Sequence, residues 1–152
     1  YFGIGLHREK FSSHQRGTAK NVGWLPGLWA DMDFSGTGKI ASGPNKKYPP
    51  RQLILEVLKS LRQPPSCIVD TGGGFHVYWL FDWPEPMSDR LRQLAKDWQD
   101  YLRRLLAPYT MDSTHDLARV LRVAGTVNTK HGHIVDVEPG YELNGKPSHA
   151  KE

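Results

Sequence analysis

The hydrophobic pattern centres on an apolar run that ends in two acidic residues. Trp24, Leu25, Leu28 and Trp29 precede the stretch Asp31-Met32-Asp33-Phe34, in which acidic and apolar side chains alternate. Successive side chains of a strand point to opposite faces, so residues 29–34 are predicted to form a strand with both carboxylates on one face, about 7 Å apart. The apolar members of the alternation then point into a core.

Two amphipathic helices are predicted from apolar residues at helical spacing. The first begins at Pro49-Pro50 and ends before Pro64-Pro65. The second is capped by Ser88 and stopped by Pro108. The apolar stripe of the first consists of Leu53, Ile54, Val57, Leu58 and Leu61, and that of the second of Leu91, Leu94, Ala95, Trp98, Leu102 and Leu105.

A β-hairpin is predicted over residues 66–82, with the turn at Gly72-Gly73-Gly74. Its second strand, Phe75 to Phe81, is apolar on both faces, which indicates a central position in the sheet. Further expected elements are a strand from Tyr1 to Leu6, a loop at 35–50, a short helix at 117–123, a turn at 125–130 and a strand at 134–137. Intermixed helices and strands around a hairpin favour an α+β domain with a mixed or antiparallel sheet.

Composition adds little beyond the size of the domain and its surroundings. The 152 residues suffice for a single domain, and the absence of an initial Met predicts a fragment of a longer protein. The net charge of +4 is ordinary for this size. Cys67 is the only cysteine, which excludes an internal disulfide or a cysteine-built zinc site and fits a cytoplasmic location. No apolar run is long enough to cross a membrane.

The residues themselves suggest a metal site and an anion site. Two carboxylates buried side by side are costly unless a cation compensates them, and their hard oxygen ligands suit Mg²⁺ or Mn²⁺. Asp31 and Asp33 therefore form the candidate metal site. Three glycines at 72–74 free successive amides to approach a phosphate, and His76 follows them directly. A glycine-rich turn beside a core histidine is the simpler explanation of that second feature.

Two more groups are candidates for the same chemistry. Asp112 or Asp116 could complete a three-carboxylate site, although capping explains at least one of them. On the expected helix at 117–123, Arg119 and Arg122 are neighbours on one face, as a triphosphate clamp would require.

Taken together, these motifs resemble the primase-polymerase branch of the archaeo-eukaryotic primase (AEP) superfamily, in particular the prim-pol domains of plasmids, phages and CRISPR-associated loci. The resemblance covers Tyr1 to Val137, in the order Asp-x-Asp, Gly-Gly-Gly-x-His-x-Tyr-Trp, and an aspartate followed by a basic block. That block, Asp116-Leu117-Ala118-Arg119-Val120-Leu121-Arg122 with Gly125-Thr126 and Asn128, is the most specific part. Ala124 stands where many relatives carry proline.

The resemblance implies a fold and a set of roles. The fold is a catalytic core with an RRM-like sheet and a small N-terminal αβ unit, here a single domain over residues 1–152. Asp31, Asp33 and Asp112 would bind two divalent metals, and Asp112 is preferred to Asp116 by its spacing. His76 would contact the phosphates of the incoming nucleotide. The remaining contacts to nucleotide or template would come from Gly72, Gly73, Gly74, Arg119, Arg122, Asn128 and Lys130.

The implied reaction is template-directed nucleotidyl transfer, in which a hydroxyl attacks the α-phosphorus of an NTP or dNTP and releases pyrophosphate. The partners would be a single-stranded DNA template, a primer, the nucleotides and further domains of the full-length protein. The basic N-terminal loop, and Lys39, Lys46 and Lys47 of the loop at 35–50, could contact the template backbone.

Two other functions stay open. A rolling-circle replication-initiator nickase also has an RRM-like sheet, and His131-Gly132-His133 weakly resembles its histidine pair. The central glycine, where a bulky apolar residue is expected, argues against this assignment. A non-catalytic RRM-type binding module would stack bases on Tyr78 and Trp79, but these alternate between faces and leave the acidic pair without a use.

Overall fold

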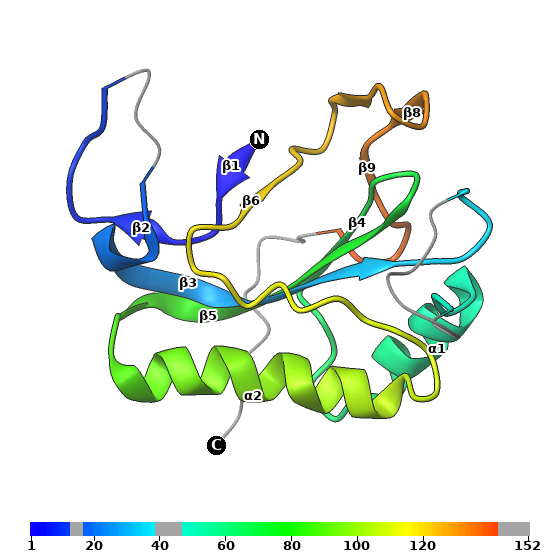
Figure 1. The fold of residues 1–152 in the computed structure, drawn as a ribbon, viewed down its shortest axis with the longest axis horizontal. Helices are drawn as coiled ribbons and strands as arrows, with labels where there is room; N and C mark the ends of the chain where they lie inside the picture. Colours follow the sequence, from blue (N-terminus) through cyan, green and yellow to red (C-terminus); the bar gives the residue numbers. More distant parts are fainter. Residues whose placement is uncertain (13–16, 39–46, 143–152) are drawn as a thin grey trace.

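The computed structural model describes residues 1–12, 17–38 and 47–142. Its main sheet has five strands in the order β2-β3-β5-β4-β9, and every pairing between them is antiparallel (Figure 1). The strands are β2 (Leu6–His7), β3 (Val22–Asp33), β4 (Cys67–Asp70), β5 (Gly74–Pro86) and β9 (Asp136–Val137). The predicted α+β class is confirmed, and the sheet is antiparallel rather than mixed. The predicted template contacts Lys39 and Lys46 lie outside the described residues.

Both predicted helices are present, and they pack on one face of the sheet (Figure 1). Helix α1 (Arg51–Ser60) follows Pro50, and helix α2 (Asp89–Leu105) is capped by the Ser88 hydroxyl, which accepts a hydrogen bond from the Leu91 amide at 3.2 Å. The core between helices and sheet contains most of the predicted apolar residues, among them Met32, Ile54, Leu58, Phe75, Val77 and Leu102, each no more than 1% exposed. Leu94 and Leu105 of the predicted stripe of α2 are instead exposed. None of the helices in the described ranges is long and apolar enough to cross a membrane.

The chain order β3-α1-β4-β5-α2, with β5 between β3 and β4, matches the expected RRM-like core. The edge beside β3 is filled by β2 from the N-terminal segment. The described part of that segment contains β1 (Phe2–Gly3), β2 and one 3-10 turn, η1 (Ala19–Asn21), rather than a separate αβ unit. The predicted strand from Tyr1 to Leu6 is interrupted at Ile4 and Gly5. Gly5 packs so closely on β3 that a Cβ there would lie 2.7 Å from the Val22 side chain.

The predicted helix at 117–123 is wrong. Val120–Leu121 forms strand β6, which pairs antiparallel with β1, and the Ile4 amide donates a hydrogen bond to the Arg119 carbonyl at 3.1 Å. So short a segment cannot stabilise a helix by itself, and its β-branched valines fit the extended pairing that β1 offers. The predicted turn at 125–130 contains β7 (Val127–Asn128), which pairs with β8 (His133–Ile134). The expected last strand is therefore split at Val135 between β8 and β9.

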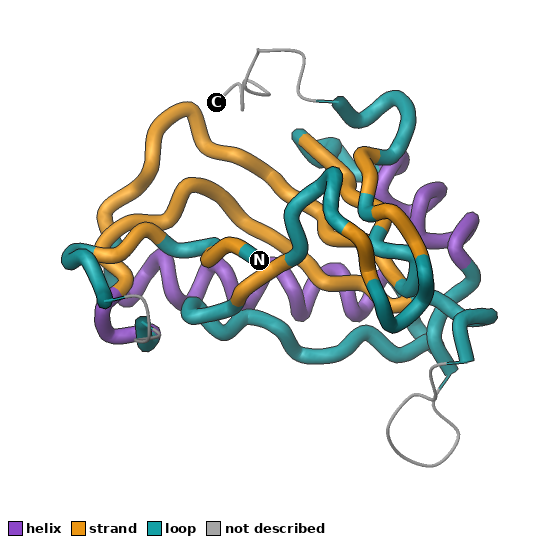
Figure 2. The backbone as a smooth tube through the Cα atoms, turned by 90° about the horizontal axis from the view of Figure 1, so that it is seen from above, coloured by secondary structure: helices purple, strands orange, loops and turns teal. Residues whose placement is uncertain are grey.

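The face of the sheet opposite the helices, here called the upper face, is partly covered by β1, β6 and the β7–β8 hairpin (Figures 1 and 2). Strands β1 and β6 lie over β3 and β5, where Phe2 contacts Tyr78 and Arg119 contacts Asp31. The β7–β8 hairpin lies against the glycine turn between β4 and β5. Asp31 and Asp33 of β3 and His76 of β5 point to the upper face, whereas Trp79 of β5 points to the helix side.

Candidate functional site

The acidic pair and the histidine share the upper face, as the alternation predicts. In the pairing of β3 with β5, Asp31 lies directly opposite His76, and Asp33 lies opposite Gly74. Residues between them, Met32 and Phe75, are buried on the helix side. The sheet thus places the two carboxylates and the imidazole side by side, although they are 43 to 45 positions apart in sequence.

His76 is buried and electrically neutral at physiological pH. Its Nε2 lies 3.8 Å from the Asp31 Oδ1 atom, and its side chain is 8% exposed. Burial lowers the pKa of His76 to about 4, the positive charges of Arg122 and Arg119 act in the same direction, and Asp33 opposes them. The buried Nδ1 atom has no hydrogen-bond partner among the described residues. A neutral imidazole offers hydrogen bonds rather than a positive charge.

This burial predicts a pH dependence of stability. A histidine whose pKa falls from 6.5 unfolded to about 4 folded has no effect above pH 6.5 and destabilises the fold as the pH drops toward 4. The full loss is about 3 kcal/mol in the free energy of unfolding. Urea denaturation at pH 7.5 and pH 4.5 measures it. His76→Gln should lose less stability between these pH values than the parent chain, and an equal loss would contradict the assignment.

Arg119 and Arg122 converge on His76, though not from a helix. Arg119 Nη2 lies 3.3 Å from Asp31 Oδ2, which makes an ion pair at the edge of the acidic pair. The Arg122 guanidinium lies 5.0 Å from the centre of the Tyr1 ring. The two arginines flank β6, and both lower the pKa of His76. The predicted helix face that would make the two arginines neighbours is absent, and β6 paired with β1 holds their backbone instead.

Asp112 joins the site through a buried tyrosine that the sequence analysis did not select. The Tyr48 hydroxyl donates a hydrogen bond of 3.0 Å to Asp112 Oδ2. Burial raises the pKa of Tyr48, and the charges of Asp112, Asp33 and Asp31 raise it further. Tyr48 therefore lies within the field of all three carboxylates. Asp116 instead accepts a hydrogen bond from the Ala118 amide at 3.0 Å, which is a local turn contact.

The chemistry of these side chains suits a hard divalent ion such as Mg²⁺. Asp31 and Asp33 offer carboxylate oxygens on one face of the sheet, and Asp112 lies near by. Within residues 1–12, 17–38 and 47–142, however, no three His, Cys, Asp or Glu side chains are grouped so that they could hold one ion. Mg²⁺ commonly binds one or two carboxylates and takes its other ligands from water and substrate phosphates. The site fits that mode, and the three-carboxylate ligand set stays a prediction.

The glycine turn is shaped by close packing. The Gly72 amide donates a hydrogen bond of 2.7 Å to Asp70 Oδ1, so it is already occupied. A Cβ on Gly73 would lie 2.7 Å from His131 Nε2, and one on Gly74 would lie 2.6 Å from the Met32 carbonyl oxygen. Glycine is required at these positions so that β3 and the 131–133 segment can approach the turn. The predicted phosphate cradle of three amides is therefore incomplete at Gly72.

Asn128 has a structural role where a ligand contact was expected. It is 3% exposed, its Nδ2 donates to the Thr71 carbonyl at 2.6 Å, and its Oδ1 accepts from the Lys130 amide at 3.3 Å. Asn128 thus ties the β7–β8 hairpin to the glycine turn. Lys130 is exposed in the same hairpin.

A buried glutamine, also missed by the sequence analysis, holds the segment that carries Asp112. Gln99 of α2 is 1% exposed and donates to the Trp29 carbonyl at 3.2 Å. Its Oε1 accepts from the Thr114 amide at 3.0 Å and the Thr114 hydroxyl at 3.2 Å, and Trp29 Nε1 donates to the Thr114 carbonyl at 3.0 Å. The available signal was a polar residue between Ala95 and Leu102, at helical spacing from both.

The residues that suggested a nickase or a base-stacking module make other contacts in the structure. His133 Nε2 lies 3.6 Å from Asp70, whereas His131 packs on Gly73, so the two histidines face different partners. Trp79 is 6% exposed and packs edge-on against Trp98 under the sheet, with ring centres 4.9 Å apart. Trp79 is thus not available to stack a base on the upper face.

Comparisons with known proteins agree with this architecture. No model of a known protein family matches the chain. A protein named "Replication protein" from Clostridium perfringens is 26% identical over 128 residues, which cover 81% of this chain and 29% of that protein. The AEP domain of the primase-polymerase of cyanophage S-2L superposes with a TM-score of 0.52 at 21% identity, over 83% of this chain and 58% of that one. The chain therefore has the fold of a primase-polymerase AEP domain, as its motifs predict. It spans less than two thirds of the length of either of these proteins.

Proposed function

We propose that this domain catalyses template-directed nucleotidyl transfer as a DNA primase-polymerase. The observation that supports it most directly is the cross-strand arrangement of Asp31 opposite His76, with Arg119 bound to Asp31 and Asp33 on the same face. Acids for metal ions, a hydrogen-bonding imidazole and a guanidinium are the groups that phosphoryl chemistry needs at close quarters. The AEP-type fold and the replication protein relative support the same assignment.

In this proposal each group has a separate task. Asp31, Asp33 and Asp112 hold two Mg²⁺ or Mn²⁺ ions, which when bound activate the attacking hydroxyl and stabilise the leaving pyrophosphate. The neutral His76 ring donates a hydrogen bond to a phosphate oxygen. Arg119 neutralises Asp31 in the free chain and lies where it can also bind phosphate. Arg122, Gly73 and Lys130 extend the same anion-binding surface.

The proposed partners are a single-stranded DNA template, a primer and NTPs or dNTPs, in a cytoplasmic setting. Exposed Lys47 directly precedes Tyr48 and is the one member of the predicted lysine group within the described residues. It would contribute to the template contact by attraction to the phosphate backbone. Further domains of a longer protein would bring additional template contacts.

A primer extension assay tests the proposal. The domain is incubated with Mn²⁺ or Mg²⁺, labelled dNTPs or NTPs, and either a primed or an unprimed single-stranded template. We expect products whose sequence follows the template and whose formation stops when the metal is chelated. Metal-independent binding of DNA without any synthesis would contradict the proposal, and site-specific nicking without nucleotide would support a nickase instead.

A further inference from the structure

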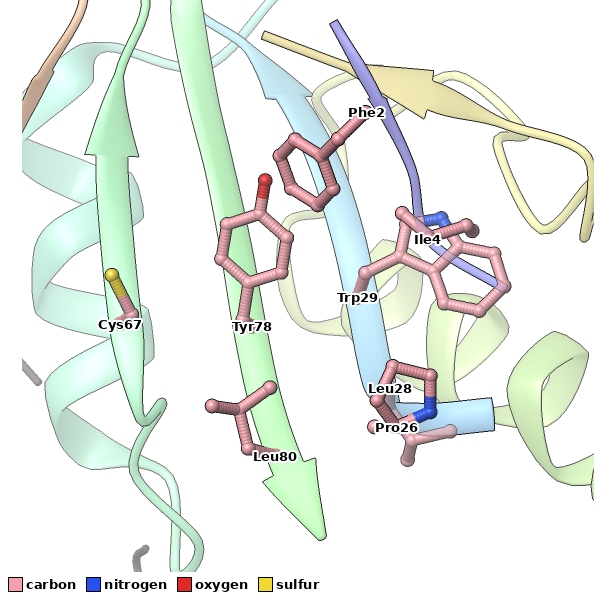
Figure 3. A pocket seen from close by; sticks show the side chains of 9 residues that line it. Phe2, Ile4, Pro26, Leu28, Trp29, Cys67, Tyr78 and Leu80 are labelled. Carbon is pink, nitrogen blue, oxygen red and sulfur yellow. The ribbon is translucent and has the colours of Figure 1, made fainter. Parts of the chain in front are cut away.

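An apolar pocket of about 250 Å³ lies on the upper face beside the acidic site (Figure 3). Trp29 of β3 and Tyr78 and Leu80 of β5 line it from the sheet. Phe2 and Ile4 of the N-terminal segment close it from above, and the Phe2 and Tyr78 rings lie 6.2 Å apart. A pocket of this size suits part of a small ligand.

The pocket is adjacent to the proposed phosphate site. Trp29 lies opposite Tyr78 in the same pairing that sets Asp31 opposite His76, and the two rows are two residues apart along each strand. That spacing is about 7 Å, comparable with the length of a sugar between a phosphate and a base. Burial raises the pKa of the Tyr78 hydroxyl, and the charges of Cys67 and Asp31 raise it further, so the field of the acidic site reaches the pocket.

The lining leaves one polar group unused. The Tyr78 hydroxyl oxygen is buried and has no hydrogen-bond partner within the described part of the chain. A buried hydroxyl without a partner destabilises the free protein, and a ligand that offers an oxygen or nitrogen there would remove the penalty. The other lining side chains named above are hydrocarbon or aromatic surface. The pocket therefore suits a flat or cyclic apolar group that carries a hydrogen-bonding atom at one place.

We propose that this pocket holds the sugar and one face of the base of the incoming nucleotide, with the Tyr78 hydroxyl bonded to an oxygen of the sugar. The inference rests on the proposed function and names its nucleoside subsite. A template-directed enzyme must accept every base and leave the pairing edge to the template. An apolar wall accepts every base, because all bases have an apolar face. It also leaves the edges, in which the bases differ, free to pair with the template. A pocket rich in edge-reading donors would select one base.

The test separates binding of the nucleoside from binding of the triphosphate. Calorimetric titrations with Mg²⁺ compare dATP, dTTP and inorganic tripolyphosphate on the parent chain and on Leu80→Trp, which fills the pocket. We expect the parent to bind both nucleotides about tenfold or more tightly than tripolyphosphate. In Leu80→Trp this advantage should disappear while tripolyphosphate affinity is unchanged. Leu94→Trp, on the half-exposed outer side of α2, is the matched control and should keep the advantage.

A second variant does not depend on filling the pocket. Tyr78→Phe keeps the ring and removes only the unpartnered hydroxyl, so the free protein should melt at the same temperature or higher. Its affinity for dATP should nevertheless fall, with no change for tripolyphosphate. If the parent binds nucleotides no better than tripolyphosphate, or if Leu80→Trp keeps the advantage, the pocket assignment is wrong while the proposed function stands. If the parent binds neither anion, the proposed function fails as well.

Discussion

Replacing Asp31 with Asn is expected to reduce metal-dependent primer extension by at least about a thousandfold. The amide keeps the shape of the side chain but removes the charge that a divalent ion requires, and Asp33→Asn should act in the same way. The effect on stability should be small, because the ion pair of Asp31 with Arg119 is partly exposed on both sides and such pairs contribute at most about 1 kcal/mol. Primer extension rates and thermal melting of each variant measure the two quantities.

The matched control is Asp97→Asn on the exposed side of α2, where the carboxylate accepts a hydrogen bond from Gln93 at 2.7 Å. The same loss of charge there should leave primer extension unchanged. Parental activity in Asp31→Asn or Asp33→Asn would refute the metal role of the acidic pair. Loss of activity together with loss of folding would instead mean that the carboxylates act on stability, which the melting measurement distinguishes.

The parts of the site that follow from local periodicity could be predicted from the sequence. The alternation at residues 31–34 assigns both carboxylates to one face, and the glycine turn with the central strand after it brings His76 to the same face. Nothing more than the two-residue period of a strand and a correct hairpin was required. The helix boundaries followed similarly from prolines and from the Ser88 cap.

The parts that depend on contacts between distant segments could not be predicted. Residues 117–123 have a helical pattern in isolation, but pairing of β1 with β6 makes them extended. The glycines at 72–74 suggested free amides, yet Asp70 and the 131–133 segment use the space. The contact between Tyr48 and Asp112 joins positions 64 residues apart with no local signature. The helix error and the missed tyrosine both arise from contacts between distant segments, whereas the Gly72 amide is bound by a neighbouring side chain.

Gln99 is the clearest case of a residue whose importance appears only in the fold, and its replacement by Leu should destabilise the domain by about 2–4 kcal/mol. Leucine fills a similar volume, but the buried Thr114 amide and hydroxyl would lose their acceptor and the Trp29 carbonyl would lose a donor. The released segment carries Asp112 two residues before Thr114. Primer extension well below the melting temperature should therefore also fall, because the third carboxylate is no longer held near β3.

Gln93→Leu on the same helix separates this effect from a general cost of losing an amide. The Gln93 side chain is exposed and its amide bonds only to Asp97 among the interactions described, so its loss should change stability by less than about 0.5 kcal/mol and leave activity intact. Urea denaturation measures the first effect and primer extension the second. If Gln99→Leu is as stable and as active as the parent chain, the link from α2 through Thr114 to Asp112 does not position the site. A stable but inactive variant would show that the link acts on the site alone.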